Sequence, residues 1–332
     1  MIPKKFIMPI VDNNLPFNAY QMRGFEFGCL LSCGKEVYPF LYSYFTNVFL
    51  YANGSKIDFT FDKGSWFDDY DVFHHKRIYL DDRAPSEWID YLKANMADGN
   101  YAYGFFDEYY VPHKFSYNRQ RFEHAFLLYG YDDEEGVFFA VGYTDSRKYE
   151  SYKIPYKNFY DAFYSFRERR DWISIRHVNL DFSFTTNIEL FYNELNEYLD
   201  SIYTGKDPIP GEIYGVNAME EMINIIENRV VNHKQIDIRA GRFFAEYRSF
   251  MLSRLNYFRE QEYMKKDYTE RYTRLINLSQ TAHLLIIKYN ITANKNIGLK
   301  IVEILREVLY VEKNILMEVS NELKDYLYHS CS

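Results

Sequence analysis

The chain has 332 residues, of which 47% are hydrophobic, 20% aromatic and 26% charged. This composition is typical of a globular protein with one large domain or two ordinary ones. The net charge of -8 and the lack of a Lys/Arg-rich stripe argue against a nucleic-acid-binding protein. No segment approaches the ~20 consecutive apolar residues that a membrane-spanning helix needs. We therefore expect neither nucleic acid nor a membrane as a partner.

The cysteines and the first residues bear on cellular compartment and on metals. The three cysteines are Cys29, Cys33 and Cys331, and no second Cys/His pair at zinc-finger spacing follows the first two. A structural zinc site is therefore not expected. The stretch 1–14 has a short apolar segment interrupted by Pro9, unlike the ~7–15 apolar residues of a secretory signal. We expect a cytoplasmic protein with free thiols.

The first half of the chain alternates short apolar stretches with turn residues. Helical spacing of apolar residues predicts helices over 29–51, 86–99 and 154–166. Apolar stretches bounded by Asp, Asn and Gly predict strands within 56–64, 76–82 and 100–112, and a hairpin over 123–145. This mixture predicts an α+β domain covering residues 1–182.

From residue 183 onward the pattern is helical. Apolar residues recur at i, i+3 and i+4 through most of this part of the chain, and a breaker containing Gly and two Pro lies at 204–211. A helical domain is therefore expected over 183–332. Its predicted helices cover 188–203, 218–230, 237–263, 267–290 and 299–327.

The hairpin EHAFLLYGYDDEEGVFFAVGYTDS carries a histidine at one end, His124, and an aspartate at the other, Asp145. A two-residue loop places the two residues directly opposite, and a four-residue loop makes them diagonal neighbours. In either register they share one face of the sheet, because side chains alternate with period two. A single-residue bulge would separate them. A carboxylate next to a histidine orients the imidazole for general acid and base catalysis.

A nucleophile for this pair is expected upstream. In GFEFGCLLSCGKEVYPF, Cys29 follows two glycines and is predicted to begin a helix, where the dipole lowers a thiol pKa. Cys33 lies one turn later and remains an alternative nucleophile. His113, next to Pro112 in a predicted loop, is an alternative base, and the adjacent His74 and His75 are expected on the surface. The order Cys29, His124, Asp145 predicts a catalytic triad in a cysteine-protease-like arrangement.

Residues 19–166 resemble the papain-fold acyltransferases related to butirosin biosynthesis protein H. The segments that carry the resemblance are Cys29 with its helical surroundings, FEHAFLLYGYDD at 122–133, VFFAVGYTD at 137–145 and KIPYKNFYDAF at 153–163. The segment RFFAEYRSFMLSRLNYF at 242–258 is similar to the appended helices of the same family. The amide-forming, cysteine-protease-like enzyme of closthioamide biosynthesis is also similar.

The resemblance implies a papain-like catalytic domain in an enzyme of natural-product biosynthesis. It implies that Cys29 accepts an acyl group from the phosphopantetheine thioester of a carrier protein and transfers it to an amine. His124 would be the base and acid, and Asp145 the orienting carboxylate. Gln21 stands eight residues before Cys29, whereas papain-like enzymes place their oxyanion-hole glutamine six before; it is nevertheless the expected oxyanion donor.

The expected partners are thus an acyl or peptidyl carrier protein and a small amine. The chain itself is not expected to hold a cofactor, because the phosphopantetheine arm belongs to the carrier. The basic segment 166–170 with Lys153 and Lys157 is a candidate docking patch for an acidic carrier, and an ordinary solvated charged face is the more common alternative for such a segment. Two other functions remain open: a cysteine peptidase or amidase with the same triad, and a non-catalytic binding protein in which Cys29 is simply buried.

Overall fold

The computed structural model describes residues 2–44, 46–53, 56–61, 65–67, 70–79, 84–165, 172–204 and 210–330. They form two compact units, one comprising Met1–Glu36 with Ser65–Phe182 and the other Val37–Gly64 with Ser183–Ser332. Residues 37–64 belong to the second of these units. The protein is α+β, with antiparallel sheets and helices first and the helical region α6–α9 last.

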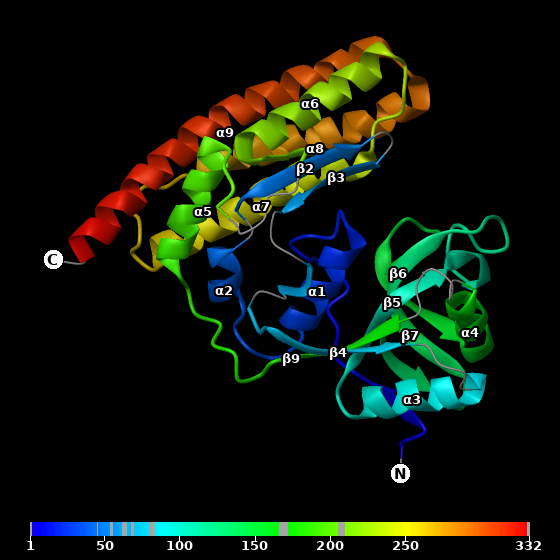
Figure 1. Ribbon diagram of the computed structural model, residues 1–332. Coiled ribbons are helices and arrows are strands. Elements are labelled where there is room, and N and C mark those ends of the chain that lie inside the picture. The colour runs from blue at the N-terminus through cyan, green and yellow to red at the C-terminus, as the bar shows by residue number, and fades with distance from the viewer. Residues whose placement is uncertain are drawn as a thin grey trace. The chain divides into compact units, whose positions relative to one another are not determined.

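An antiparallel sheet forms the centre of the first unit (Figure 1). Among the described residues it has seven strands, in the order β4-β9-β5-β6-β7-β8, with β1 paired to β6. The strands are β1 (Lys5–Ile7), β4 (Phe73–Tyr79), β5 (Tyr101–Asp107), β6 (Glu123–Asp132), β7 (Val137–Tyr143), β8 (Tyr149–Pro155) and β9 (Trp172–Val178). The helices are α1 (Gln21–Leu31), α3 (Pro85–Ala97) and α4 (Tyr156–Tyr164), with short 3-10 turns η1 (Ser65–Phe67) and η2 (Glu108–Tyr110).

The two faces of this sheet are covered by different helices. On one face, apolar residues of α3 and α4 pack on Phe106, Phe126 and Phe138 in a buried core. On the other face lies α1, whose Phe25 contacts the rings of Tyr103 and Tyr149. Period-two alternation along the strands supplies an apolar side chain to each layer. The predicted helices 86–99 and 154–166 correspond to α3 and α4.

The predicted hairpin is β6 and β7, but its register changes along its length. At the turn Asp132 pairs with Val137, and farther along Leu127 pairs with Val141, with a bulge between Leu128 and Gly130. The bulge lies where β1 joins the sheet. A Cβ on Gly130 would lie 2.6 Å from the carbonyl oxygen of Phe6, so glycine permits this close approach. The residues of β6 that precede the bulge, including His124, pair with β7 one position out of step with the residues next to the turn.

The predicted helix 29–51 is wrong. The helix α1 begins earlier, at Gln21, and ends at Leu31, and a separate helix α2 covers Tyr38–Ser43. Gly34 between them has a φ of +72°, a conformation that interrupts a helix and favours glycine. The end of the predicted helix belongs instead to strand β2 (Val48–Asn53), which pairs with β3 (Lys56–Phe61). Helical spacing alone did not distinguish this β-branched and aromatic stretch from a helix.

The second unit contains the helices that the sequence predicts (Figure 1). They are α5 (Ile188–Asp200), α6 (Gly215–Val231), α7 (Ile238–Glu260), α8 (Thr269–Thr292) and α9 (Lys295–Ser330), with strand β10 (Glu212–Tyr214) added to β2. Phe59 and Phe61 of β3 contact Phe243 of α7. Arg248 of α7 forms a 2.6 Å ion pair with Glu312 of α9, and neither side chain is exposed. No helix in the described ranges has the length and apolar character to cross a bilayer.

Candidate active site

Cys29 lies in the last turn of α1, not at a helix start as predicted. Its side chain is fully buried, and burial raises the thiol pKa well above its ordinary value, although a hydrogen bond with Tyr101 acts in the opposite direction. The buried carboxyl of Glu26 on the same helix also raises this pKa. A reactive thiolate needs a lowered pKa and access to substrate, and Cys29 has neither. Cys33 is half-buried and lies beyond the end of α1.

Cys29 and His124 are not brought together. The thiol contacts Tyr101, at the start of β5, whereas His124 is paired with Phe106, near the end of the same strand. Tyr101 and Phe106 are five positions apart along β5, which corresponds to about 17 Å of extended chain. The two predicted catalytic groups therefore lie at opposite ends of β5.

Asp145 does not face His124 either, so the predicted shared face is wrong. Beyond the bulge Leu127 lies opposite Val141, and continuing this register places Glu123 opposite Asp145. His124 is the next residue after Glu123, so its side chain belongs to the opposite face of the sheet from that of Asp145. Asp145 lies in the turn that follows β7, is exposed, and donates its backbone N–H to the carbonyl of His113. His113, the alternative base, is exposed with a φ of +66°.

Gln21 connects the two strands where their own pairing ends. Its side-chain amide donates to the carbonyl of Ala125 on β6 at 2.7 Å and accepts from the N–H of Tyr143 on β7 at 2.8 Å. The amide lies against Gly142, whose φ of +150° and missing Cβ make room for it. Both ends of the amide group are used in holding the sheet, so Gln21 acts here as a structural bridge and not as an oxyanion donor.

The group that orients His124 is Glu108, which the sequence interpretation missed. Nδ1 of His124 lies 2.7 Å from Oε1 of Glu108, which follows β5 directly in η2. The Glu108 side chain is 7% exposed, and that of His124 is 32% exposed. A carboxylate on Nδ1 keeps the proton there and leaves Nε2 as the basic nitrogen. This is the geometry of a general base, with an imidazole that solvent or substrate reaches.

The buried amine of Lys114 lies close to the Glu108–His124 pair. Nζ of Lys114 lies 3.9 Å from Oε1 of Glu108 and donates to the carbonyl of Tyr143 at 2.6 Å. It also lies 4.3 Å from the ring centre of Tyr152, and its side chain is only 1% exposed. Burial lowers the Lys114 pKa to about 8, while the Glu108 carboxylate favours the protonated amine. Lys114 thus supports Glu108 from the interior and has no route to a substrate.

Glu108 was missed because its partnership depends on a non-local register. Phe106 pairs with His124, and the N–H of Glu108 bonds to the carbonyl of Phe122, so the alternation of β5 and β6 brings Glu108 to the His124 face. The connection between the two strands, residues 108–122, is long and largely irregular. Such a connection does not define a register from sequence, unlike a tight hairpin turn. The only local signal was an acidic pair, Asp107 and Glu108, at the end of an apolar strand.

The predicted docking patch for a carrier protein lies partly outside the described residues. Lys153 is engaged by Glu135, and the basic segment 166–170 lies outside the described residues. Within the described ranges, no group of three or more His, Cys, Asp or Glu side chains is arranged to hold a metal ion. Among the described residues, the Glu108–His124 pair is the candidate catalytic site.

Comparisons with known proteins add no family to this picture. No protein-family model matches the chain, and no curated protein matches it significantly.

Proposed function

We propose that the chain is an acyl-transfer enzyme in which His124, oriented by Glu108, is the general base. The observation that carries the proposal is the 2.7 Å contact between Nδ1 of His124 and Oε1 of Glu108, with the imidazole partly exposed. The papain-like resemblance supplies the substrate class, a thioester on a carrier protein and an amine acceptor. A helix packed on β6 and β7, with the histidine near the start of β6, supports a papain-like first unit.

In this proposal the acyl group passes directly from donor to acceptor. The amine nitrogen attacks the thioester carbonyl, the new C–N bond forms, and the C–S bond breaks. Nε2 of His124 takes the proton that the nitrogen loses and returns it to the leaving thiolate, so that an amide and a free thiol result. Glu108 stabilises the imidazolium formed between the two steps. A covalent cysteine intermediate is not part of the scheme, because Cys29 is buried with a raised thiol pKa.

The test is an acyl-transfer assay with an acyl-N-acetylcysteamine thioester or acyl-loaded carrier protein and a panel of amines. His124→Gln should lower kcat by about 10²- to 10⁴-fold, as expected for loss of a general base. The matched control Cys29→Ala should retain activity, and intact-mass spectrometry should find no acyl-protein adduct. An adduct that Cys29→Ala abolishes would overturn the proposal and restore the cysteine mechanism. Amide hydrolysis without any amine would instead indicate the peptidase or amidase.

A specific observation favours the second candidate, a non-catalytic binding protein. The segment around the start of α1, residues 17–24, has no Cys, Ser or Thr, so no nucleophile stands at the helix end that touches β6 beside His124. This candidate predicts that the wild-type chain binds the acyl thioester without turnover. It also predicts that His124→Gln leaves the affinity, measured by calorimetry, unchanged.

A further inference from the structure

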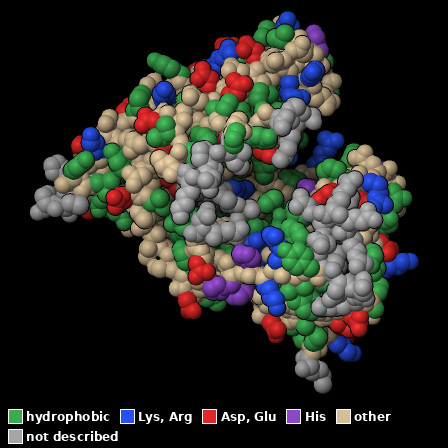
Figure 2. All heavy atoms as spheres, viewed as in Figure 1, with side chains coloured by type: hydrophobic (Ala, Val, Ile, Leu, Met, Phe, Trp, Pro, Cys, Tyr) green, Lys and Arg blue, Asp and Glu red, His purple; other side chains and the backbone are tan. Residues whose placement is uncertain are grey.

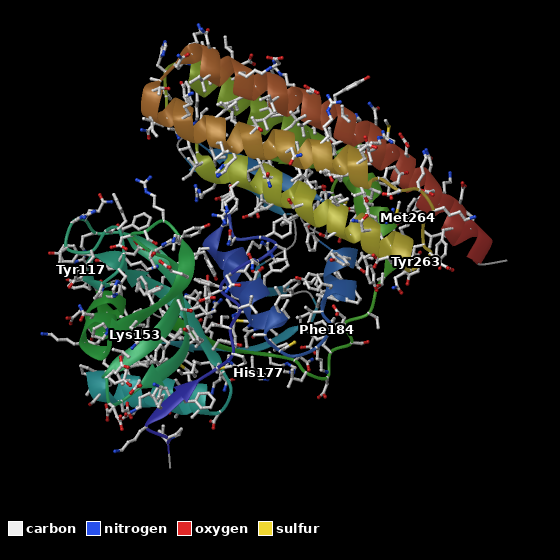
Figure 3. The ribbon with its side chains drawn as sticks, turned by 180° about the vertical axis from the view of Figure 1, so that it is seen from behind. Tyr117, Lys153, His177, Phe184, Tyr263 and Met264 are labelled. Atoms are coloured by element: carbon white, nitrogen blue, oxygen red, sulfur yellow. The ribbon has the colours of Figure 1, made fainter. Side chains whose placement is uncertain are left out.

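Two histidines outside the candidate active site lie directly opposite each other at the edge of the sheet. His74 of β4 pairs with His177 of β9, and β4 is the outermost strand of the described sheet. Their ring centres are 5.0 Å apart, with an angle of 57° between the ring planes. Histidine side chains gather on the surface over these strands in Figure 2, and His177 is labelled in Figure 3. Both side chains are accessible, that of His74 being 47% exposed.

Each ring is held through the same nitrogen. Nδ1 of His74 lies 3.3 Å from Oδ1 of Asp71, and Nδ1 of His177 lies 3.1 Å from Oδ1 of Asn100. An oxygen acceptor at Nδ1 places the proton there, so the lone pair of each ring is on Nε2. Metal-binding histidines in proteins are commonly fixed in this way by a carboxylate or carbonyl oxygen on the second nitrogen.

The spacing of the rings fits a shared ion. A tetrahedral ion with metal–nitrogen distances of about 2.0–2.1 Å places two rings bound through Nε2 with their centres about 5 Å apart. The observed separation is 5.0 Å.

We propose that His74 and His177 form a two-histidine site for a divalent cation of the zinc class, with water completing the coordination. Imidazole suits Zn²⁺, Ni²⁺ and Cu²⁺, and all the protein ligands come from two paired strands. The bound ion joins the edge strand β4 to β9. Positions occupied by water remain open for a donor atom from another molecule.

His75 provides a matched control for this site. It neighbours His74 on β4 but pairs with Arg176, so it belongs to the other face of the strand. Its side chain therefore cannot join His177 in binding one ion. Substitution of His75 removes one exposed imidazole and leaves the proposed site intact.

The test is a calorimetric titration of the full chain with Zn²⁺ at pH 7.5 in a buffer that does not chelate metal. His74→Gln and His177→Gln should each weaken binding by at least about tenfold, and His75→Gln should leave it unchanged. In the wild type, Zn²⁺ should shift two of the eight histidine ring resonances, those that the two variants lose. Equal weakening by His75→Gln, or wild-type affinity in His74→Gln and His177→Gln, would show adventitious binding elsewhere and overturn the proposal.

Discussion

The buried amine of Lys114 gives the first unit a defined dependence of stability on pH. Its pKa is lowered by burial from 10.5 to about 8 in the folded protein. Between these two values the unfolded chain binds the proton and the folded chain does not. The free energy of unfolding therefore rises with pH across this window, and the full difference is about 3 kcal/mol. About 2 kcal/mol of this is gained between pH 7 and 9.5.

Lys114→Met removes the titrating group and keeps an unbranched side chain of similar length. The variant loses the hydrogen bond to Tyr143 and the contact with the Tyr152 ring, so its stability at pH 7 combines gains and losses. The pH dependence of the difference in unfolding free energy between wild type and variant is simpler to interpret, because the contributions of the other titrating groups largely cancel in that difference. We expect wild type to gain about 2 kcal/mol relative to Lys114→Met on raising the pH from 7 to 9.5.

Urea unfolding followed by tryptophan fluorescence measures this difference. All three tryptophans, Trp66, Trp88 and Trp172, belong to the first unit, so their emission reports on the unit that contains Lys114. Measurements stop at pH 9.5, below the ordinary tyrosine pKa of about 10. Parallel stability curves for wild type and variant over this range would refute the assignment of a lowered pKa to Lys114.

Three further predictions follow from buried contacts. Gln21→Leu removes the side-chain partner of the Ala125 carbonyl and of the Tyr143 N–H, so it should cost about 2–4 kcal/mol in the same urea assay; a loss below about 0.5 kcal/mol would contradict the bridging role. Arg248→Met should destabilise the second unit by about 3–5 kcal/mol in circular dichroism, because Glu312 is left buried and unpaired, and adding Glu312→Leu should recover part of the loss. Iodoacetamide at pH 7 should modify Cys33 faster than the buried Cys29; rapid labelling of Cys29 in the folded chain would refute this order.

Much of the fold was predictable because it depends on local patterns. The helices of the second unit follow from apolar residues at i, i+3 and i+4, and the β6–β7 hairpin follows from apolar stretches around an acidic, glycine-ended turn. The α+β class also followed from these patterns. The segment 29–51 failed because its apolar spacing fits a helix and a strand equally well, and only pairing between β2 and β3 decides between them.

The candidate site depended on contacts that no local pattern contains. The sequence by itself identified His124 as a histidine at one end of a predicted hairpin. Only the tertiary structure gave it Glu108 as a partner in place of Asp145, because the bulge before Gly130 shifts one register and a long connection sets another. Burial of Cys29, in the last turn of α1, likewise results from packing, and it is this burial that raises the thiol pKa. Residue types determined which chemistry was available, and strand register and burial determined which groups can carry it out.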